Sequence, residues 1–336
     1  MEAIAELWQR MPEDLRQYLE EQTSLDDIPI CEQEPADVAS EVILVGAGQI
    51  KVYFPEFSHG KMVVFLHFPG GICKSGINRD QSWCSNLAKQ SGSIHIAVDY
   101  PSAPTTGFRQ ILAECMSAVE KVRQLCICQW KETWNTDPTR IVLSGSSAGA
   151  TLAIIIAAIA ARNDEPVYGL IALVPLIDTD PNLAGDPWGD NENTVGLRPT
   201  RLLSDLNAAF NDDPRFRDHW HGNPYKMPDD VVSMLPRTII LSAKLDILYR
   251  SQSKFKERLR TRGVKVSGIE VDGLHQVKDM DQVTAAGRKA RQYILRVSRE
   301  FIKQAARSTD EGSGIVPSLQ HIEALRPWDV RRLATL

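Results

Sequence analysis

Three serines lie close together in the segment IVLSGSSAGA, which spans residues 141–150 and begins with an apolar run. A serine hydroxyl can act as a nucleophile on a tight strand-to-helix turn that has glycines two positions before and after it. Only Ser147 meets that spacing, because it lies between Gly145 and Gly149. The pattern therefore predicts Ser147 as a nucleophile. A turn of small residues that serves only packing is the alternative interpretation.

A serine hydroxyl is weakly nucleophilic at neutral pH, so it needs a general base and a carboxylate that orients this base. Four histidines follow Ser147 in the chain: His219, His221, His275 and His321. His275 comes shortly after the last predicted strand, in the segment VDGLH, where a base can reach a nucleophile at a strand end. We therefore expect His275 to be the base, and a surface loop histidine is the alternative.

The orienting carboxylate is expected between the nucleophile and the histidine in the chain. Asp246 meets this expectation, because it follows the apolar run at residues 237–242 and precedes His275. Asp272 is the competing candidate, but it lies three positions from His275 on the same turn. Asp246 is therefore the favoured carboxylate.

A serine nucleophile also needs N–H groups that bind the negative charge on the reacting carbonyl oxygen, and losing one donor costs about 2.7–4 kcal/mol. The segment FLHFPGGI at residues 65–72 contains Gly70 and Gly71, whose N–H groups carry no side-chain obstruction. Pro69 has no N–H and cannot donate. With the N–H of Ala148, these glycines form the predicted oxyanion hole. An ordinary Pro-Gly turn is the alternative.

The elements that must position these residues alternate between strand-like apolar runs and helix-like patterns. Strands are expected at residues 49–55, 61–68, 93–100, 139–144, 169–177, 237–242 and 265–271. Helices are expected at residues 108–130, 148–162, 249–262 and 280–304. This alternation predicts an α/β fold, with a mostly parallel central sheet covered by helices on both faces.

Two segments interrupt the alternation. The first is amphipathic and acidic, and we expect it to form an N-terminal cap segment at residues 1–40. The second is rich in Pro, Asn, Asp and Trp and is expected to be a cap insertion at about residues 178–236, with a helix near 200–210. Such an insertion between two strands can cover a site at the sheet edge. The catalytic domain would then span residues 41–305, followed by a C-terminal tail at 306–336.

These motifs resemble the hormone-sensitive-lipase-like branch of the α/β-hydrolases, a family with many carboxylesterases. The resemblance covers about residues 61–303 and rests on PGG, VDYPSAP, GSSAGA, LVPLID, AKLDIL and GLHQV. It implies the α/β-hydrolase fold with a helical cap. It also implies Ser147 as nucleophile, His275 as general base and acid, and Asp246 as the orienting carboxylate.

Three positions depart from the family's pattern. The His-Gly-Gly-Gly motif aligns with residues 68–71 (FPGG), so His67 lies one position too early. Ser146 stands where the family often has Asp, and Pro101 replaces the usual Arg after the Asp-Tyr pair. None of these changes removes a predicted catalytic group, but they change the scaffold of the loop and leave room for altered activity.

The amino-acid composition limits the kinds of molecule that the protein is expected to bind. The 336 residues are 43% hydrophobic and 24% charged, with a formal net charge of −5, which argues against nucleic acid as the main partner. No apolar stretch reaches the about 20 residues that span a bilayer, and the N-terminal segment lacks a signal-peptide core. We expect a cytoplasmic monomer or homodimer that binds a small hydrophobic ester and uses no cofactor or metal.

The leading hypothesis is therefore a serine hydrolase that cleaves small or medium hydrophobic acyl or acetyl esters through an acyl-enzyme. The divergent PGG turn suggests a role in specialised metabolism. One alternative keeps the same fold and side chains for acyl transfer, elimination or cyclisation in natural-product biosynthesis. Another is a non-enzymatic ligand receptor, which would be expected to have lost one of the three catalytic side chains.

Overall fold

The computed structural model describes residues 38–56, 60–71, 73, 80–179, 206–210, 213–273, 275 and 285–307. Most of the predicted N-terminal cap segment and of the C-terminal tail lies outside these residues, as does the stretch 180–205 of the predicted cap insertion. The domain boundaries expected from the sequence therefore stay predictions.

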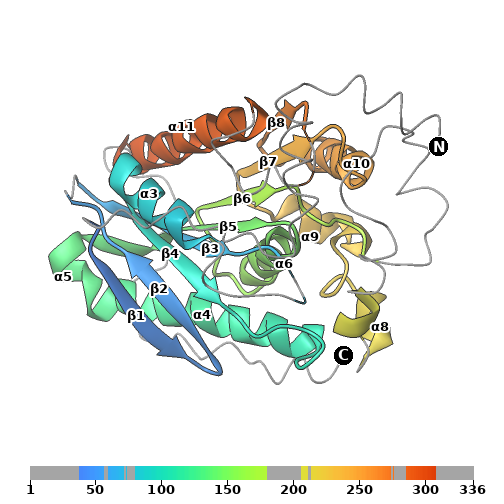
Figure 1. Ribbon diagram of the computed structural model, residues 1–336, viewed down its shortest axis with the longest axis horizontal. Coiled ribbons are helices and arrows are strands. Elements are labelled where there is room, and N and C mark those ends of the chain that lie inside the picture. The colour runs from blue at the N-terminus through green and yellow to red at the C-terminus, as the bar shows by residue number, and fades with distance from the viewer. Residues whose placement is uncertain are drawn as a thin grey trace, which may run out of the picture.

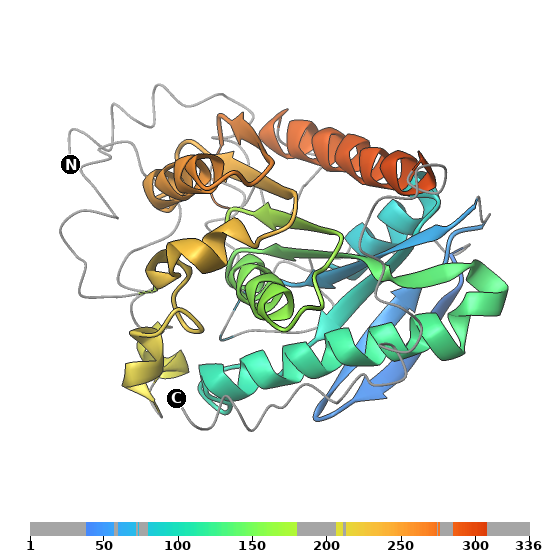
Figure 2. The same cartoon turned by 180° about the vertical axis from the view of Figure 1, so that it is seen from behind.

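An eight-stranded sheet forms the centre of the described chain (Figures 1 and 2). Its strands are β1 (Ser40–Val45), β2 (Gly48–Tyr53), β3 (Met62–Phe68), β4 (Ile94–Asp99), β5 (Thr136–Ser146), β6 (Gly169–Leu173), β7 (Thr238–Ala243) and β8 (Val266–Val271). They lie in the order β1-β2-β4-β3-β5-β6-β7-β8. The pairs β1–β2 and β2–β4 are antiparallel, and all later pairs are parallel. The prediction of a mostly parallel sheet is confirmed.

Helices cover both faces of the sheet (Figure 2). One face packs against α4 (Phe108–Cys128), α6 (Ala148–Arg162) and α10 (Tyr249–Thr261), and the other against α3 (Gln81–Ser91) and α11 (Ala285–Arg307). The shorter helices are α5 (Trp130–Trp134), α8 (Pro214–Arg217), η1 (Pro224–Lys226) and α9 (Asp229–Ser233).

The sequence of β3, MVVFLHF, explains how a strand can be buried on both faces. Val64 and Leu66 pack toward the α4 and α6 side, whereas Val63 and Phe65 pack toward α3 and α11. Successive side chains point to opposite faces, so an unbroken apolar run is what a central parallel strand requires. His67 is the polar exception in this strand, and it is buried.

Some element boundaries differ from the sequence-based expectation. The strand expected at 169–177 ends at Leu173, because Val174 has a φ of 41° and Pro175 has no N–H for the ladder. The sequence did not reveal β1, whose residues Val42 and Leu44 are exposed, or α3, whose sequence is largely polar. These elements lack the strong apolar pattern on which the predictions relied.

None of the helices in the described ranges is long and apolar enough to cross a bilayer. The most apolar of the main helices, α6, has 15 residues, whereas a membrane span needs about 20. Its apolar character reflects burial beneath the sheet. The cytoplasmic location expected from the sequence stays a prediction.

Candidate active site

Ser147 lies on the turn between β5 and α6, with φ of 52° and ψ of −118°. Such a backbone conformation costs a residue other than glycine about 1–3 kcal/mol, and the surroundings must hold it. The Ser147 N–H donates to the carbonyl of Leu173, at the end of β6, over 2.8 Å. Because α6 begins at Ala148, the Ser147 hydroxyl lies at a helix N-terminus, where free N–H groups favour negative charge.

The two glycines around Ser147 allow the turn to pack closely. A Cβ on Gly145 would clash with the carbonyl group of Gly149. A Cβ on Gly149 would clash with the carbonyl oxygens of Phe68 and Pro69, which lead into the PGG turn. Backbone contact therefore sets the distance between the serine turn and the PGG turn.

We expect Gly149→Ala to lower kcat for ester hydrolysis at least about tenfold, because the new methyl group must push the PGG turn away from Ser147. Ala153→Gly is a matched control on the same helix. It should cost about 1 kcal/mol of stability without touching the PGG turn, and kcat should stay within about twofold. Steady-state kinetics and Tm measure both effects. A wild-type kcat in Gly149→Ala would show that the contact does not set the geometry of the site.

His275 and Asp246 lie beside Ser147. The distance from His275 Nε2 to Ser147 Oγ is 2.9 Å, and the distance from His275 Nδ1 to Asp246 Oδ2 is 2.7 Å. Both side chains are buried, with 1% of Asp246 and 4% of His275 exposed. A carboxylate can only accept hydrogen bonds, so Nδ1 carries the proton and Nε2 is left to accept from the serine hydroxyl.

The β7–β8 ladder explains why residues distant in the chain meet here. At the ends of the two strands, the N–H of Lys244 donates to the carbonyl of Val271 over 2.9 Å, and the N–H of Leu245 donates to the carbonyl of Gly273 over 3.1 Å. The two loops that follow these strands therefore run side by side. Asp246 and His275, one on each loop, are thereby brought together.

The competing carboxylate points elsewhere. Asp272 Oδ1 lies 2.8 Å from Lys244 Nζ, and its side chain is 75% exposed. Asp246 is instead held in place from its other oxygen, because Oδ1 accepts the N–H of Leu248 over 3.0 Å. The structure thus joins His275 to Asp246 and leaves Asp272 on the surface.

Two of the other downstream histidines, His219 and His221, lie away from this site. His219 and His221 pack around Trp220, whose ring faces Arg162 at the last residue of α6. Ser147 precedes the first residue of that helix, and a helix of 15 residues is about 22 Å long. Burial lowers the pKa of His221 to about 3, so this ring is neutral. His321 lies outside the described residues.

Two of the predicted oxyanion donors, Gly70 and Ala148, lie next to Ser147. A Cβ at Gly70 would lie 3.1 Å from the carbonyl oxygen of Ser146 and 3.5 Å from the Cβ of Ser147, so the two turns touch. Gly71 follows with a φ of 98°, a conformation that glycine favours. Ala148 is the first residue of α6, where the N–H has no partner within the helix.

Sequence reasoning missed two groups that support the PGG turn. The Tyr100 hydroxyl donates to the carbonyl of Pro69 over 2.5 Å. His67 Nε2 lies 2.9 Å from Asp80 Oδ2, on the residue before α3. The segment VDYPSAP drew attention to Tyr100 only as part of a motif, and nothing in the sequence around Asp80 indicated a partner.

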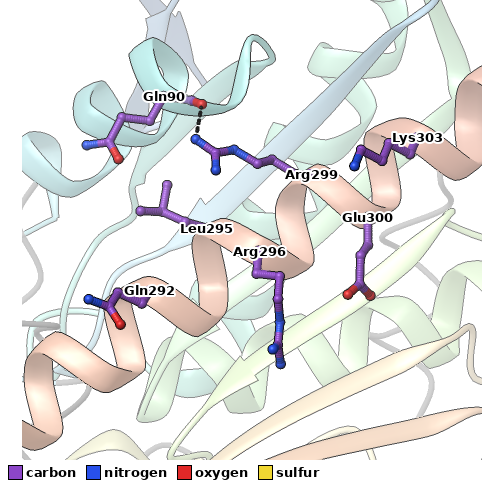
Figure 3. Close-up of a pocket in the computed structure, with 7 residues that line it drawn as sticks. All are labelled: Gln90, Gln292, Leu295, Arg296, Arg299, Glu300 and Lys303. Atoms are coloured by element: carbon purple, nitrogen blue, oxygen red, sulfur yellow. Dashed lines mark hydrogen bonds between the residues drawn. The ribbon is translucent and has the colours of Figure 1, made fainter.

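A separate groove lies between α3 and α11 (Figure 3). It is lined by Gln90, Gln292, Leu295, Arg296, Arg299, Glu300 and Lys303, and Arg299 donates to the carbonyl of Gln90 over 3.1 Å. None of these residues is among the predicted site residues. In the parts of the chain that the structure describes, no cluster of three or more His, Cys, Asp or Glu could hold a metal ion.

A family described as alpha/beta hydrolase fold matches residues 63–277. This chain belongs to the α/β-hydrolase fold family, and the fold and the family resemblance expected from its motifs are confirmed.

Several curated proteins are similar to part of this chain. The chain is 26% identical to an AB hydrolase superfamily protein of Schizosaccharomyces pombe, over 67% of this chain and 66% of the relative. It is 23% identical to human arylacetamide deacetylase-like 3, over 75% of each chain. It is 28% identical to carboxylesterase/phospholipase LipF of Mycobacterium tuberculosis, over 61% of this chain and 52% of the relative. The matched region thus spans only about half to three-quarters of these relatives.

Solved structures share the fold. The carboxyl esterase 2 of Tuber melanosporum superposes with a TM-score of 0.73 at 20% identity, over 88% of this chain and 99% of that one. An esterase of Pyrobaculum calidifontis superposes with a TM-score of 0.72 at 21% identity, over 87% and 99%. At these sequence identities, the structural similarity establishes only that the fold is shared.

Proposed function

We propose that this protein is a carboxylic ester hydrolase that works through an acyl-enzyme on Ser147. The observation that carries the proposal is the hydrogen-bonded series from Ser147 through His275 to Asp246, with distances of 2.9 and 2.7 Å. Within this series, Ser147 lies next to Gly70 and directly before the first residue of α6. Relatives named as a carboxylesterase and an arylacetamide deacetylase-like protein support an ester as the substrate.

Each group then has one task. The Ser147 hydroxyl attacks the carbonyl carbon while His275 Nε2 takes its proton, and the N–H groups of Gly70, Gly71 and Ala148 bind the oxyanion. The bond to the alcohol breaks as His275 returns the proton to the leaving oxygen. Water then attacks the acyl-serine while His275 takes its proton, and His275 returns that proton to Ser147 Oγ as the carboxylic acid leaves. Asp246 stays ionised and stabilises the imidazolium in both halves.

The proposed substrates are small or medium hydrophobic acyl or acetyl esters. The predicted cap insertion at 178–236 supports a covered site, and a covered apolar site favours hydrophobic acyl groups. A role in specialised metabolism, expected from the divergent PGG turn, stays a prediction.

The test is product analysis with a series of p-nitrophenyl esters of increasing acyl length in isotopically labelled water. We expect one labelled oxygen in the acid product and the fastest turnover with short or medium chains. Acyl groups found on an added alcohol or amine, with little labelled acid, would favour the acyl-transfer alternative. A protein that turns over none of these esters would contradict the proposal.

A further inference from the structure

The imidazole of His67 is engaged at both nitrogens. It is 2% exposed, and its Nδ1 lies 2.9 Å from Ser144 Oγ while its Nε2 lies 2.9 Å from Asp80 Oδ2. The carboxylate can only accept, so Nε2 carries a proton and donates to Asp80. In the neutral ring, Nδ1 then accepts from the Ser144 hydroxyl. A buried polar side chain with both ends bonded in this way is fixed in orientation.

The contact between His67 and Asp80 joins two residues that flank the predicted oxyanion donors in the chain. His67 is two residues before the PGG turn, and Asp80 is the residue that precedes α3. Gly70 and Gly71 lie between these two ends, so the hydrogen bond joins the segment at its base. Joining the ends of a loop restricts the conformations open to the residues within it.

The same imidazole also contacts the strand that leads into the serine turn. His67 of β3 is the register partner of Ser144 of β5, and Phe68 is the partner of Gly145. The Ser146 hydroxyl lies 3.4 Å from His67 Nε2, one residue before Ser147. One side chain therefore connects the start of the PGG turn, the serine turn and the start of α3.

The hydrogen bond between His67 and Asp80 is buried, so breaking it costs free energy. Asp80 is 5% exposed, and burial together with the nearby Asp80 carboxylate raises the pKa of the Cys84 thiol well above its usual range. An anionic carboxylate in such surroundings needs hydrogen-bond donors. Loss of the His67 N–H would remove a hydrogen-bond donor from the buried Asp80 carboxylate, which carries an energetic cost.

We propose that His67 and Asp80 are positioning residues that hold the Gly70 and Gly71 N–H groups in register with Ser147. This inference rests on the proposed function, because it assigns a role within the same site. Neither side chain touches the ester; both act through the PGG turn. Oxyanion donors stabilise the transition state more than the bound ester, so loosening them lowers kcat while KM changes little.

The variants His67→Ala, His67→Gln and Asp80→Asn test the proposal in the full-length protein with p-nitrophenyl butyrate. We expect kcat to fall about 10- to 100-fold in His67→Ala and Asp80→Asn, with KM within about threefold. His67→Gln should recover part of the loss, because its amide can donate to Asp80 and accept from Ser144. A double variant should be about as slow as the worse single one, because both act on the same hydrogen bond: His67→Ala removes its donor, and Asp80→Asn replaces its charged acceptor with a weaker neutral one.

His95 offers a matched control, because it is another buried histidine on the neighbouring strand β4. Its ring stacks on Phe65 at 4.6 Å, and its Nε2 bonds to the hydroxyls of Ser91 and Ser93 over 3.1 and 3.0 Å. Burial lowers its pKa to about 3, so the ring is neutral at assay pH. His95→Gln should lower Tm but leave kcat within about twofold.

A second readout separates positioning from general destabilisation. Active-site titration with a fluorophosphonate gives the concentration of folded sites, and kcat is expressed per site. Inhibition by a trifluoromethyl ketone reports the oxyanion hole, because its tetrahedral adduct carries the same negative oxygen. We expect its Ki to rise in proportion to the loss of kcat in His67→Ala and Asp80→Asn.

The inference is wrong if kcat per site and Ki stay at wild-type values in both His67→Ala and Asp80→Asn, or if His95→Gln loses as much kcat. That result is distinct from failure of the proposed function. If the wild-type protein hydrolyses no ester, or if Ser147→Ala keeps its rate, then the function itself is wrong. An active wild type, an inactive Ser147→Ala and fully active His67 and Asp80 variants would overturn only the positioning role.

Discussion

Ser147→Ala is expected to abolish ester hydrolysis, with kcat falling about 10⁴-fold or more. The alanine removes the only atom at this position that can form the acyl-enzyme, while the fold and the oxyanion donors stay in place. Initial rates with p-nitrophenyl butyrate measure the effect, and Tm confirms that the variant is folded. Any residual rate above the background would come from the donors at Gly70, Gly71 and Ala148.

The neighbouring serines make the experiment specific. Ser144 is bonded to His67, and Ser146 lies near the same ring, so neither hydroxyl faces His275. We expect Ser144→Ala and Ser146→Ala to lose about tenfold or less in kcat. Ser117→Ala, on α4, is a control outside the site. A large loss in Ser144→Ala with full activity in Ser147→Ala would contradict the assignment of the nucleophile.

His275→Ala is expected to reduce kcat about as strongly as Ser147→Ala, because without the base the serine hydroxyl keeps its proton. Asp246→Asn should lose about 10⁴-fold, since an amide can donate to Nδ1 and so favours the wrong tautomer of His275. The hydrogen bonds of 2.9 and 2.7 Å identify both residues as parts of one unit. The losses should therefore not add in a double variant.

Asp272→Asn is the matched control for this prediction. Asp272 is the carboxylate nearest to His275 in sequence, but its side chain is 75% exposed and paired with Lys244. We expect kcat within about twofold of wild type, because a surface ion pair contributes little. If Asp272→Asn were inactive and Asp246→Asn active, the roles of the two carboxylates would have to be exchanged.

The sequence was sufficient for the features that follow from local patterns. The mostly parallel sheet followed from buried apolar runs between helical patterns. The meeting of Ser147, Asp246 and His275 followed from glycine spacing and from positions just after strands. Parallel strands end at one edge of a sheet, so residues after β5, β7 and β8 had to converge there.

The features of the site that the sequence did not predict depend on contacts that produce no periodic pattern in the chain. Asp80 is hydrogen-bonded to His67, which precedes the PGG turn. Tyr100, which follows another strand, is hydrogen-bonded to Pro69 within that turn. Both contacts are polar and join residues that are far apart in the chain. Periodic patterns in the sequence indicate only apolar faces and local turns, so they could not predict these contacts. The strained backbone at Val174, which ends β6 early, is likewise imposed by the surrounding fold.

Mass spectrometry of the intact protein after treatment with a fluorophosphonate tests most directly whether Ser147 is the nucleophile. We expect one adduct per chain, located by peptide mapping on Ser147, absent in Ser147→Ala and formed much more slowly in His275→Ala. An adduct on another residue, or an adduct that persists in Ser147→Ala, would contradict this assignment.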